Sequence, residues 1–204
     1  MARDSKGGTH FLNAAFDGNI KEVNRLISVA KSRNVLSQLI NLPQFVGATP
    51  LFAASQEGHV EVVKTLISNG ASIDQAVDNG PAPIYVASQK GHPDVVQNLL
   101  ISGAENMFGA KKYTVLHIAA QKNHHDIIQL LIKDSKVRNL IDDTSNEYRD
   151  TPLTSAIQFA GDLEMVRLLV SAGANWKKKG DGKTPLQWAI EERKPRIVDY
   201  LRKL

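Results

Sequence analysis

A block of about 33 residues recurs along almost the whole chain, and this internal repeat restricts the fold more than any other feature. The clearest copy begins at 49–54 (TPLFAA), continues with Gly58-His59 and ends near Gly70-Ala71. A period of this length is typical of stacked units, in which each unit covers an apolar face of its neighbour. The position of the threonine in Thr-Pro-Leu is taken as the anchor of each block, and the six anchors are Thr9, Thr49, Ala82, Thr114, Thr151 and Thr184.

Each block reads as a helix–turn–helix unit. A proline follows four anchors, where a first helical residue needs no N–H partner, and a threonine before it can cap the helix. An alanine lies five residues after every anchor, which lets helices approach closely, and a glycine such as Gly58 then ends the first helix. The second helix is predicted from apolar residues at helical spacing, as in Val62, Val63, Leu66 and Ile67.

These residues resemble the ankyrin repeat family, whose signature is Thr-Pro-Leu-His-x-Ala with a period near 33. The resemblance covers residues 9–204 and is strongest at 47–74 and 147–176, whereas the first block departs most and is expected to be an atypical cap. It implies an all-α solenoid of stacked helix–turn–helix units with hairpin-like loop tips. We therefore expect one domain over residues 1–204, with repeats at about 5–41, 45–77, 78–109, 110–142, 147–179 and 180–204.

Two segments, 28–38 and 134–146, make the repeat longer than its usual period. Both contain apolar residues and are compatible with helix, so we expect extended second helices or longer connections. Two interpretations remain open, a neutral insertion on one face of the stack or a feature specific to a partner.

The composition is that of an intracellular protein, and we expect a cytoplasmic monomer. The chain has no cysteine, which excludes a disulfide framework and a thiolate metal site. Its start lacks an apolar leader, and no run of eighteen apolar residues is present. The net charge of +4 is modest, although lysines are frequent in the later turns.

The sequence argues against an enzyme and predicts no cofactor. Segment 180–184 (GDGKT) ends like a phosphate-binding loop, but the glycine required five residues before Gly182 is replaced by Lys177. Histidines recur at one repeat position, as His59, His92 and His124, which indicates packing and hydrogen bonding, because metal ligands must converge on one point. We therefore predict no catalytic site and no metal site.

Within the ankyrin family, partners bind the inner face of the first helices and the tips of the preceding turns. Carried over by offset, the helix positions are Gln56, Glu57, Gln89, Lys90, Gln121, Lys122, Gln158 and Phe159. The corresponding turn positions are Phe45, Asn79, Lys111, Lys112, Tyr113, Tyr148 and Arg149. The glutamines can instead be ordinary polar helix residues, and a one-residue insertion before Gly161 can turn Phe159 inward.

The resulting hypothesis is an adaptor or scaffold module that binds a protein or peptide partner. A second hypothesis is a targeting domain of a larger enzyme, or of a bacterial effector delivered into the cytoplasm of a host cell. It draws on the absence of cysteine and on the end of the chain at 200–204 without a polar cap. A nucleic-acid or lipid binder is a third hypothesis and predicts a steep salt dependence. Nucleic acid is disfavoured, because the lysines stand on separate turns without an aromatic platform.

Overall fold

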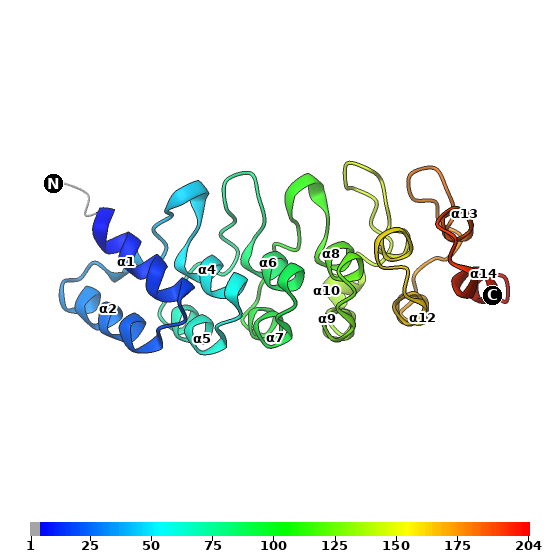
Figure 1. Cartoon of the computed structure of the whole chain (residues 1–204). Coiled ribbons are helices and arrows are strands. Elements are labelled where there is room, and N and C mark those ends of the chain that lie inside the picture. The colour runs from blue at the N-terminus through cyan, green and yellow to red at the C-terminus, as the bar shows by residue number, and fades with distance from the viewer. Residues whose placement is uncertain (1–4) are drawn as a thin grey trace. The chain divides into compact units, whose positions relative to one another are not determined.

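The protein is described by a computed structural model, in which residues 5–204 are placed. This range contains 14 α-helices and no β-strand, and the chain divides into two compact parts between Asn106 and Met107. In each part the first and second helices of the repeats form two adjacent rows, and loops extend from the row of first helices (Figure 1). The expected helix–turn–helix units are thus present in both parts.

The part that ends at Asn106 contains three helix pairs. First helix α4 packs against both α1 and α6, while second helix α5 packs against α2 and α7. The first helices are α1 (Ser5–Phe16), α4 (Pro50–Glu57) and α6 (Pro83–Lys90). The second helices are α2 (Ile20–Ser32), α5 (Val60–Ser68) and α7 (Pro93–Ile101), and α2 is followed by the short α3 (Leu36–Leu39).

The part that begins at Met107 also contains three pairs. First helix α8 packs against α11, and second helix α12 packs against α9 and α14. The first helices are α8 (Val115–Gln121), α11 (Pro152–Ser155), which continues as a π-helix over Ala156–Ala160, and α13 (Pro185–Glu191). The second helices are α9 (His125–Leu131), α12 (Leu163–Ser171) and α14 (Pro195–Leu201), and α9 is followed by the short α10 (Ser135–Arg138).

The anchor threonines cap the first helices as the sequence predicts. The side chain of Thr49 accepts a hydrogen bond from the Phe52 N–H at 3.2 Å, and Thr114, Thr151 and Thr184 cap their helices in the same way. Thr9 differs, because α1 begins at Ser5 and therefore contains this position. The first block thus starts its helix earlier than the other repeats do.

Replacing Ala82 with threonine is expected to stabilise the protein by about 1 kcal/mol, the usual value of a helix N-cap. Ala82 is the N-cap residue of α6 and makes no side-chain cap hydrogen bond. This position can hold a threonine, because Thr49, Thr114 and Thr151 are as buried as Ala82 at the same repeat position. Urea unfolding of Ala82→Thr tests this, and Ala82→Val, which adds similar volume without the hydroxyl, is the control. Equal effects of both exchanges would contradict a capping role.

The two longer segments both add helix. In the first, α2 extends to 13 residues with Ala30 buried, and α3 follows it. In the second, Asp134 caps α10 by accepting from the Lys136 and Val137 N–H groups, and Val137 is fully buried. Since each segment contributes a buried apolar side chain, both belong to the packed structure.

A π-helix accommodates the one-residue insertion in the fifth repeat. Residues Ala156–Ala160 adopt this wider turn, and the helix ends at Gly161 in the left-handed conformation. Ala156 and Ile157 remain buried on the core side, whereas the Phe159 side chain is 54% exposed. The alternative in which the insertion turns Phe159 inward is therefore wrong, because the extra residue is taken up by the backbone.

Candidate functional site

The loops before the first helices, which we call tip loops, are short hairpins at residues 44–48, 77–81, 109–113, 146–150 and 180–183. Most are closed by a backbone hydrogen bond, such as that from the Gln44 N–H to the Ala48 carbonyl at 2.8 Å. Neighbouring tip loops within each part are also joined. The Asp78 N–H donates to the Val46 carbonyl at 3.0 Å, and the Glu147 N–H donates to the Lys111 carbonyl at 3.0 Å.

The carbonyls that join the tip loops belong to residues with a positive φ. Val46, Lys111 and Arg149 have φ angles of 52°, 59° and 58°, and the Arg149 carbonyl accepts from the Asp181 N–H at 3.3 Å. This left-handed conformation is costly for residues other than glycine, asparagine and aspartate, above all for a β-branched valine. It is maintained here because it directs each carbonyl toward the next loop. Backbone hydrogen bonds therefore hold neighbouring tip loops together within each part.

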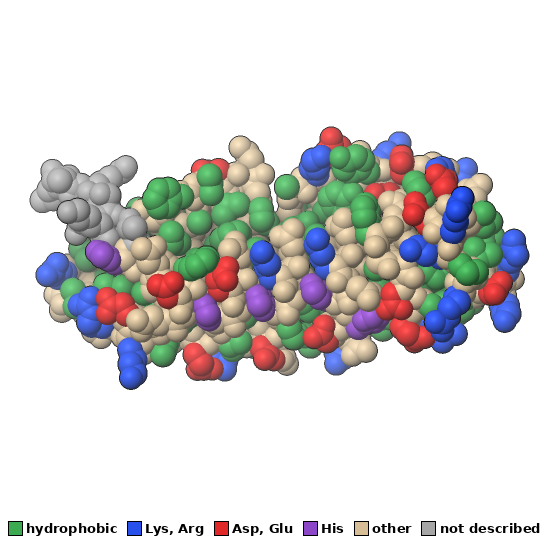
Figure 2. Space-filling view, in the orientation of Figure 1, with side chains coloured by type: hydrophobic (Ala, Val, Ile, Leu, Met, Phe, Trp, Pro, Cys, Tyr) green, Lys and Arg blue, Asp and Glu red, His purple; other side chains and the backbone are tan. Residues whose placement is uncertain are grey.

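In the part that ends at Asn106, the predicted residues are exposed or half-buried, and they are dispersed. Phe45 and Val46 are 77% and 76% exposed at the first tip loop, where hydrophobic atoms are visible in Figure 2. Gln56 is half-buried at the end of α4 and donates to the Glu57 carboxylate at 2.8 Å. The other predicted residues on this part are the exposed Asn79 and Lys90 and the half-buried Gln89.

In the part that begins at Met107, four predicted residues come together, and we call Lys111, Tyr113, Glu147, Tyr148, Asp150 and Gln158 the tip cluster. The Lys111 ammonium donates to the Tyr148 hydroxyl at 2.9 Å and lies 3.2 Å from the Glu147 carboxylate. The Tyr113 and Tyr148 ring centroids are 6.3 Å apart. These contacts raise the pKa of Lys111, mainly through its hydrogen bonds to Tyr148 and Glu147.

Asp150 lies in the tip cluster but is not among the residues predicted from the sequence. Its carboxylate accepts from the Tyr113 hydroxyl and from the Gln158 amide, each at 3.4 Å. Burial raises the pKa of this carboxyl, and the charge of Asp181 acts in the same direction. Its position in the repeat could have indicated it, since Asp150 and Tyr113 both directly precede the anchor threonine of their repeats.

The side chains of the other predicted residues on this part make no described contact with the tip cluster, although several are exposed. Lys112, Lys122 and Arg149 are exposed, Gln121 is half-buried, and Phe159 follows the cluster residue Gln158 in sequence. The predicted surface therefore contains one interconnected group and several separate side chains.

Three of the six histidines form hydrogen bonds between neighbouring repeats. The Nε2 atoms of His59 and His92 donate to the carbonyls of Phe16 and Gln56 in the preceding repeat, at 2.8 and 2.9 Å. His117 is fully buried, and its Nε2 donates to the Asp150 carbonyl at 2.9 Å. Burial lowers the pKa of His117 to about 4. No cluster of three or more metal-ligating side chains occurs within residues 5–204.

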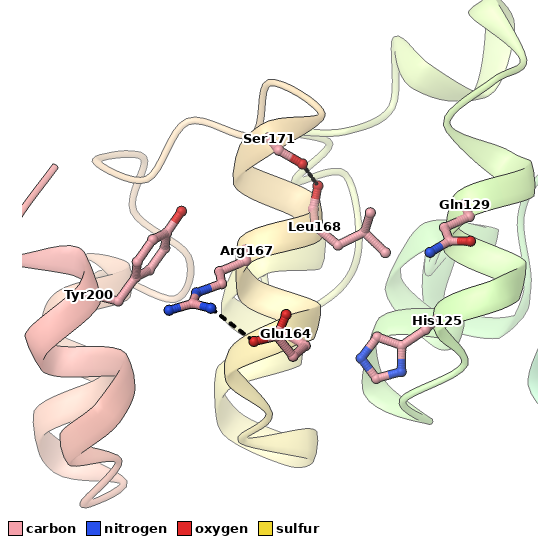
Figure 3. A pocket seen from close by; sticks show the side chains of 7 residues that line it. All are labelled: His125, Gln129, Glu164, Arg167, Leu168, Ser171 and Tyr200. Carbon is pink, nitrogen blue, oxygen red and sulfur yellow. Dashed lines mark hydrogen bonds and ion pairs between the residues drawn. The ribbon is translucent and has the colours of Figure 1, made fainter.

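A second candidate region is a pocket of about 530 Å³ among the second helices α9, α12 and α14 (Figure 3). Its lining is largely engaged in local contacts. Arg167 pairs with Glu164 at 3.0 Å and lies 5.5 Å from the Tyr200 ring, while the Ser171 hydroxyl donates to the Leu168 carbonyl. One side chain links two repeats here, because His125 Nε2 is 2.9 Å from the carboxylate of Asp162, the N-cap residue of α12. The sequence pattern did not predict that contact.

No described helix combines the length and the apolar character needed to span a lipid bilayer. Among known structures, EF0377, an ankyrin repeat protein, is similar with a TM-score of 0.83 and 25% identity, over 95% of this chain and 96% of that one. The human ASB11 ankyrin repeat domain has a TM-score of 0.78 and 25% identity, over 95% and 82% of the two chains.

A third similar structure is the complex of a predatory endopeptidase from Bdellovibrio bacteriovorus with an immunity protein. One chain of that complex matches this chain with a TM-score of 0.80 and 25% identity, over 95% of this chain and 97% of that one. An ankyrin repeat protein of Rickettsia bellii (strain RML369-C) is 48% identical over 48 residues. That match spans 24% of this chain and only 14% of the relative's length.

A family model for ankyrin repeats matches the chain in three overlapping copies, at residues 11–109, 84–180 and 116–204. These matches cover nearly all of the described structure, and ankyrin repeats generally bind proteins and typically lack catalytic activity. The three similar structures each match over 95% of this chain. The chain belongs to the ankyrin repeat family.

Proposed function

We propose that the chain is a protein-binding module that engages a protein or peptide partner through its first helices and tip loops. Two findings support a protein partner. The chain belongs to the ankyrin repeat family, and one similar structure is a complex of two Bdellovibrio proteins. The observation that carries the proposal is the set of exposed aromatic side chains on the hydrogen-bonded tip loops and on the π-helix. Phe45, Tyr148 and Phe159 are 77%, 47% and 54% exposed.

Ordered aromatic side chains are well suited to an interface. Large aromatic residues contribute most of the energy at many protein interfaces, and they do so best when little conformational freedom is lost on binding. The backbone hydrogen bonds between tip loops already restrict Tyr148, whose hydroxyl also accepts from Lys111. A partner that binds this surface would therefore meet side chains that are largely ordered beforehand.

Replacement of Tyr113, Tyr148 and Phe159 by alanine together is expected to weaken partner binding at least about 30-fold, the effect of losing a single hot-spot residue of about 2 kcal/mol. Partners can be captured from cell lysate on the wild-type protein, identified by mass spectrometry and purified. Their affinities for wild type and the triple variant are then compared by titration calorimetry, with circular dichroism as a check of helical content.

The matched control is Ile101→Ala on second helix α7. Ile101 is 78% exposed, so this exchange also removes an exposed large apolar side chain, but from outside the proposed surface. It should leave the affinity unchanged. Equal affinities for wild type and the triple variant would contradict the proposed surface, as would a greater loss in Ile101→Ala.

The second candidate function, a targeting module within a longer bacterial protein, is favoured by the Rickettsia bellii match. That relative is much longer than the segment it shares with this chain. The complete open reading frame distinguishes the two candidates. A frame that also encodes a catalytic domain would support the targeting module, whereas a frame limited to these 204 residues would contradict it.

A further inference from the structure

We propose that Asp150 is the anchor of a site that takes an arginine side chain of the protein partner, between Tyr113 and Gln158 in the tip cluster. This inference rests on the proposed function, because it assigns a chemistry to part of the same surface. Asp150 is only 3% exposed, and no ion pair to its carboxylate occurs within residues 5–204. A buried carboxylate without a cation is costly, and a partner that supplies the cation recovers that cost on binding.

The lysines on the two neighbouring tip loops, Lys111 and Lys183, contact other side chains. Lys111, on the preceding tip loop, is bound to Glu147 and Tyr148. Lys183 holds the same repeat position as Asp150 in the next repeat, but its ammonium pairs with Glu191 at 2.5 Å and lies 4.2 Å from the Trp188 ring. Neither lysine therefore compensates the charge of Asp150 in any described contact.

The contacts that the carboxylate does make are weak enough to be replaced. Tyr113 and Gln158 donate to it at 3.4 Å, which is long for a hydrogen bond. Both side chains are half-buried and therefore partly accessible from solvent. An incoming guanidinium needs to displace only these two contacts to reach the carboxylate, and the raised pKa of Asp150 agrees with a charge that lacks compensation.

The surroundings favour arginine over lysine. A planar guanidinium pairs with a carboxylate through two parallel hydrogen bonds and also stacks on aromatic faces, whereas an ammonium is a strongly hydrated point charge. The hydroxyl at the end of the Tyr113 ring lies 3.4 Å from the carboxylate, and the neighbouring Tyr148 ring already has a cation, Lys111, 5.0 Å from its centroid. The tip cluster therefore combines a carboxylate with aromatic rings, and a guanidinium interacts favourably with both.

The site can be tested with small probes before any partner is known. Isotope-labelled wild-type protein is titrated by NMR with three blocked tripeptides, Gly-Arg-Gly, Gly-Lys-Gly and Gly-citrulline-Gly, of which the last has nearly the shape of arginine without its charge. We expect the arginine peptide to bind at least about 5-fold more tightly than the citrulline peptide and more tightly than the lysine peptide. The largest amide shifts should be those of Tyr113, Asp150 and Gln158.

Asp150→Asn, which keeps the shape and removes the charge, should reduce the affinity for the arginine peptide to that for the citrulline peptide. The matched control is Asp181→Asn on the next tip loop, where the carboxylate is exposed, and it should preserve the preference for arginine. Persistence of that preference in Asp150→Asn, or its loss in Asp181→Asn alone, would overturn the proposal.

The wild-type titrations decide the question even if Asp150→Asn fails to fold. Equal affinity for the arginine and citrulline peptides, tighter binding of the lysine peptide, or shifts centred outside the tip cluster would each contradict an arginine site at Asp150. A contradicted arginine site would not contradict the wider protein-binding surface, because that surface is tested separately by the partner affinity of the triple aromatic variant.

Discussion

Lowering the pH from 7 to 4 is expected to reduce the free energy of unfolding by about 3 kcal/mol through His117 alone. The side chain is fully buried, and burial lowers its pKa from 6.5 to about 4. Between these two values the unfolded chain binds a proton that the folded chain excludes, so stability falls as the pH falls. The contribution is complete above pH 6.5 and is lost progressively down to about pH 4.

The geometry around His117 explains why protonation is so unfavourable. Its Nδ1 accepts from the Thr114 N–H at 3.2 Å, while its Nε2 donates to the Asp150 carbonyl at 2.9 Å. The imidazole therefore has to be neutral, with its proton on Nε2. A proton on Nδ1 would face the Thr114 N–H, replacing a hydrogen bond with the repulsion of two donors.

The control variant is His117→Gln, for which the chain provides a precedent. Gln187 holds the same position in the last repeat, and its Oε1 accepts from the Thr184 N–H at 2.8 Å. Urea unfolding midpoints at pH 7, 5.5 and 4.5 should decrease steeply for wild type and clearly less for His117→Gln. Identical pH profiles for the two proteins would show that other groups, such as Asp162, dominate acid destabilisation.

The sequence predicted the repeat unit well because its signals are local. The threonine caps, the prolines at the first helical positions and the left-handed turn at Gly58 each depend on a few consecutive residues. Six copies of the same pattern then reinforce one another. Exceptions occur where one copy departs from the pattern, as at Arg193, which adopts a left-handed φ of 54° without being glycine or asparagine.

The candidate site was predicted less completely, since it depends on contacts between repeats. The positions of Tyr113, Tyr148 and Gln158 followed from family offsets. The contacts of Tyr113 and Gln158 with Asp150, and of Tyr148 with Tyr113, instead join two tip loops and the π-helix. The strained conformation of Val46 is likewise explained by the Asp78 N–H on the next tip loop, 32 residues further along the chain. Such pairings cannot be read from the local pattern of one repeat.

Gly58, which ends first helix α4, is expected to be sensitive for a reason beyond backbone conformation. Gly58→Ala should destabilise the protein by about 2–3 kcal/mol, the sum of a left-handed alanine and a lost hydrogen bond. A Cβ at Gly58 would lie 2.6 Å from Nδ1 of His92, so the ring would have to move. That movement would break the 2.9 Å hydrogen bond from His92 to the Gln56 carbonyl in the preceding repeat.

Gly70→Ala separates the two contributions. Gly70 has a φ of 91°, but no atom lies within 4 Å of a Cβ added there, so this exchange carries only the backbone cost. Its effect on the urea unfolding free energy should be smaller than that of Gly58→Ala by at least about 1 kcal/mol, the value of the histidine contact. In a His92→Ala background the two glycine exchanges should become equally costly, because the ring is no longer present. If Gly58→Ala remained as damaging without His92, the histidine would not be what makes this glycine necessary, and the sensitivity would lie in the backbone alone.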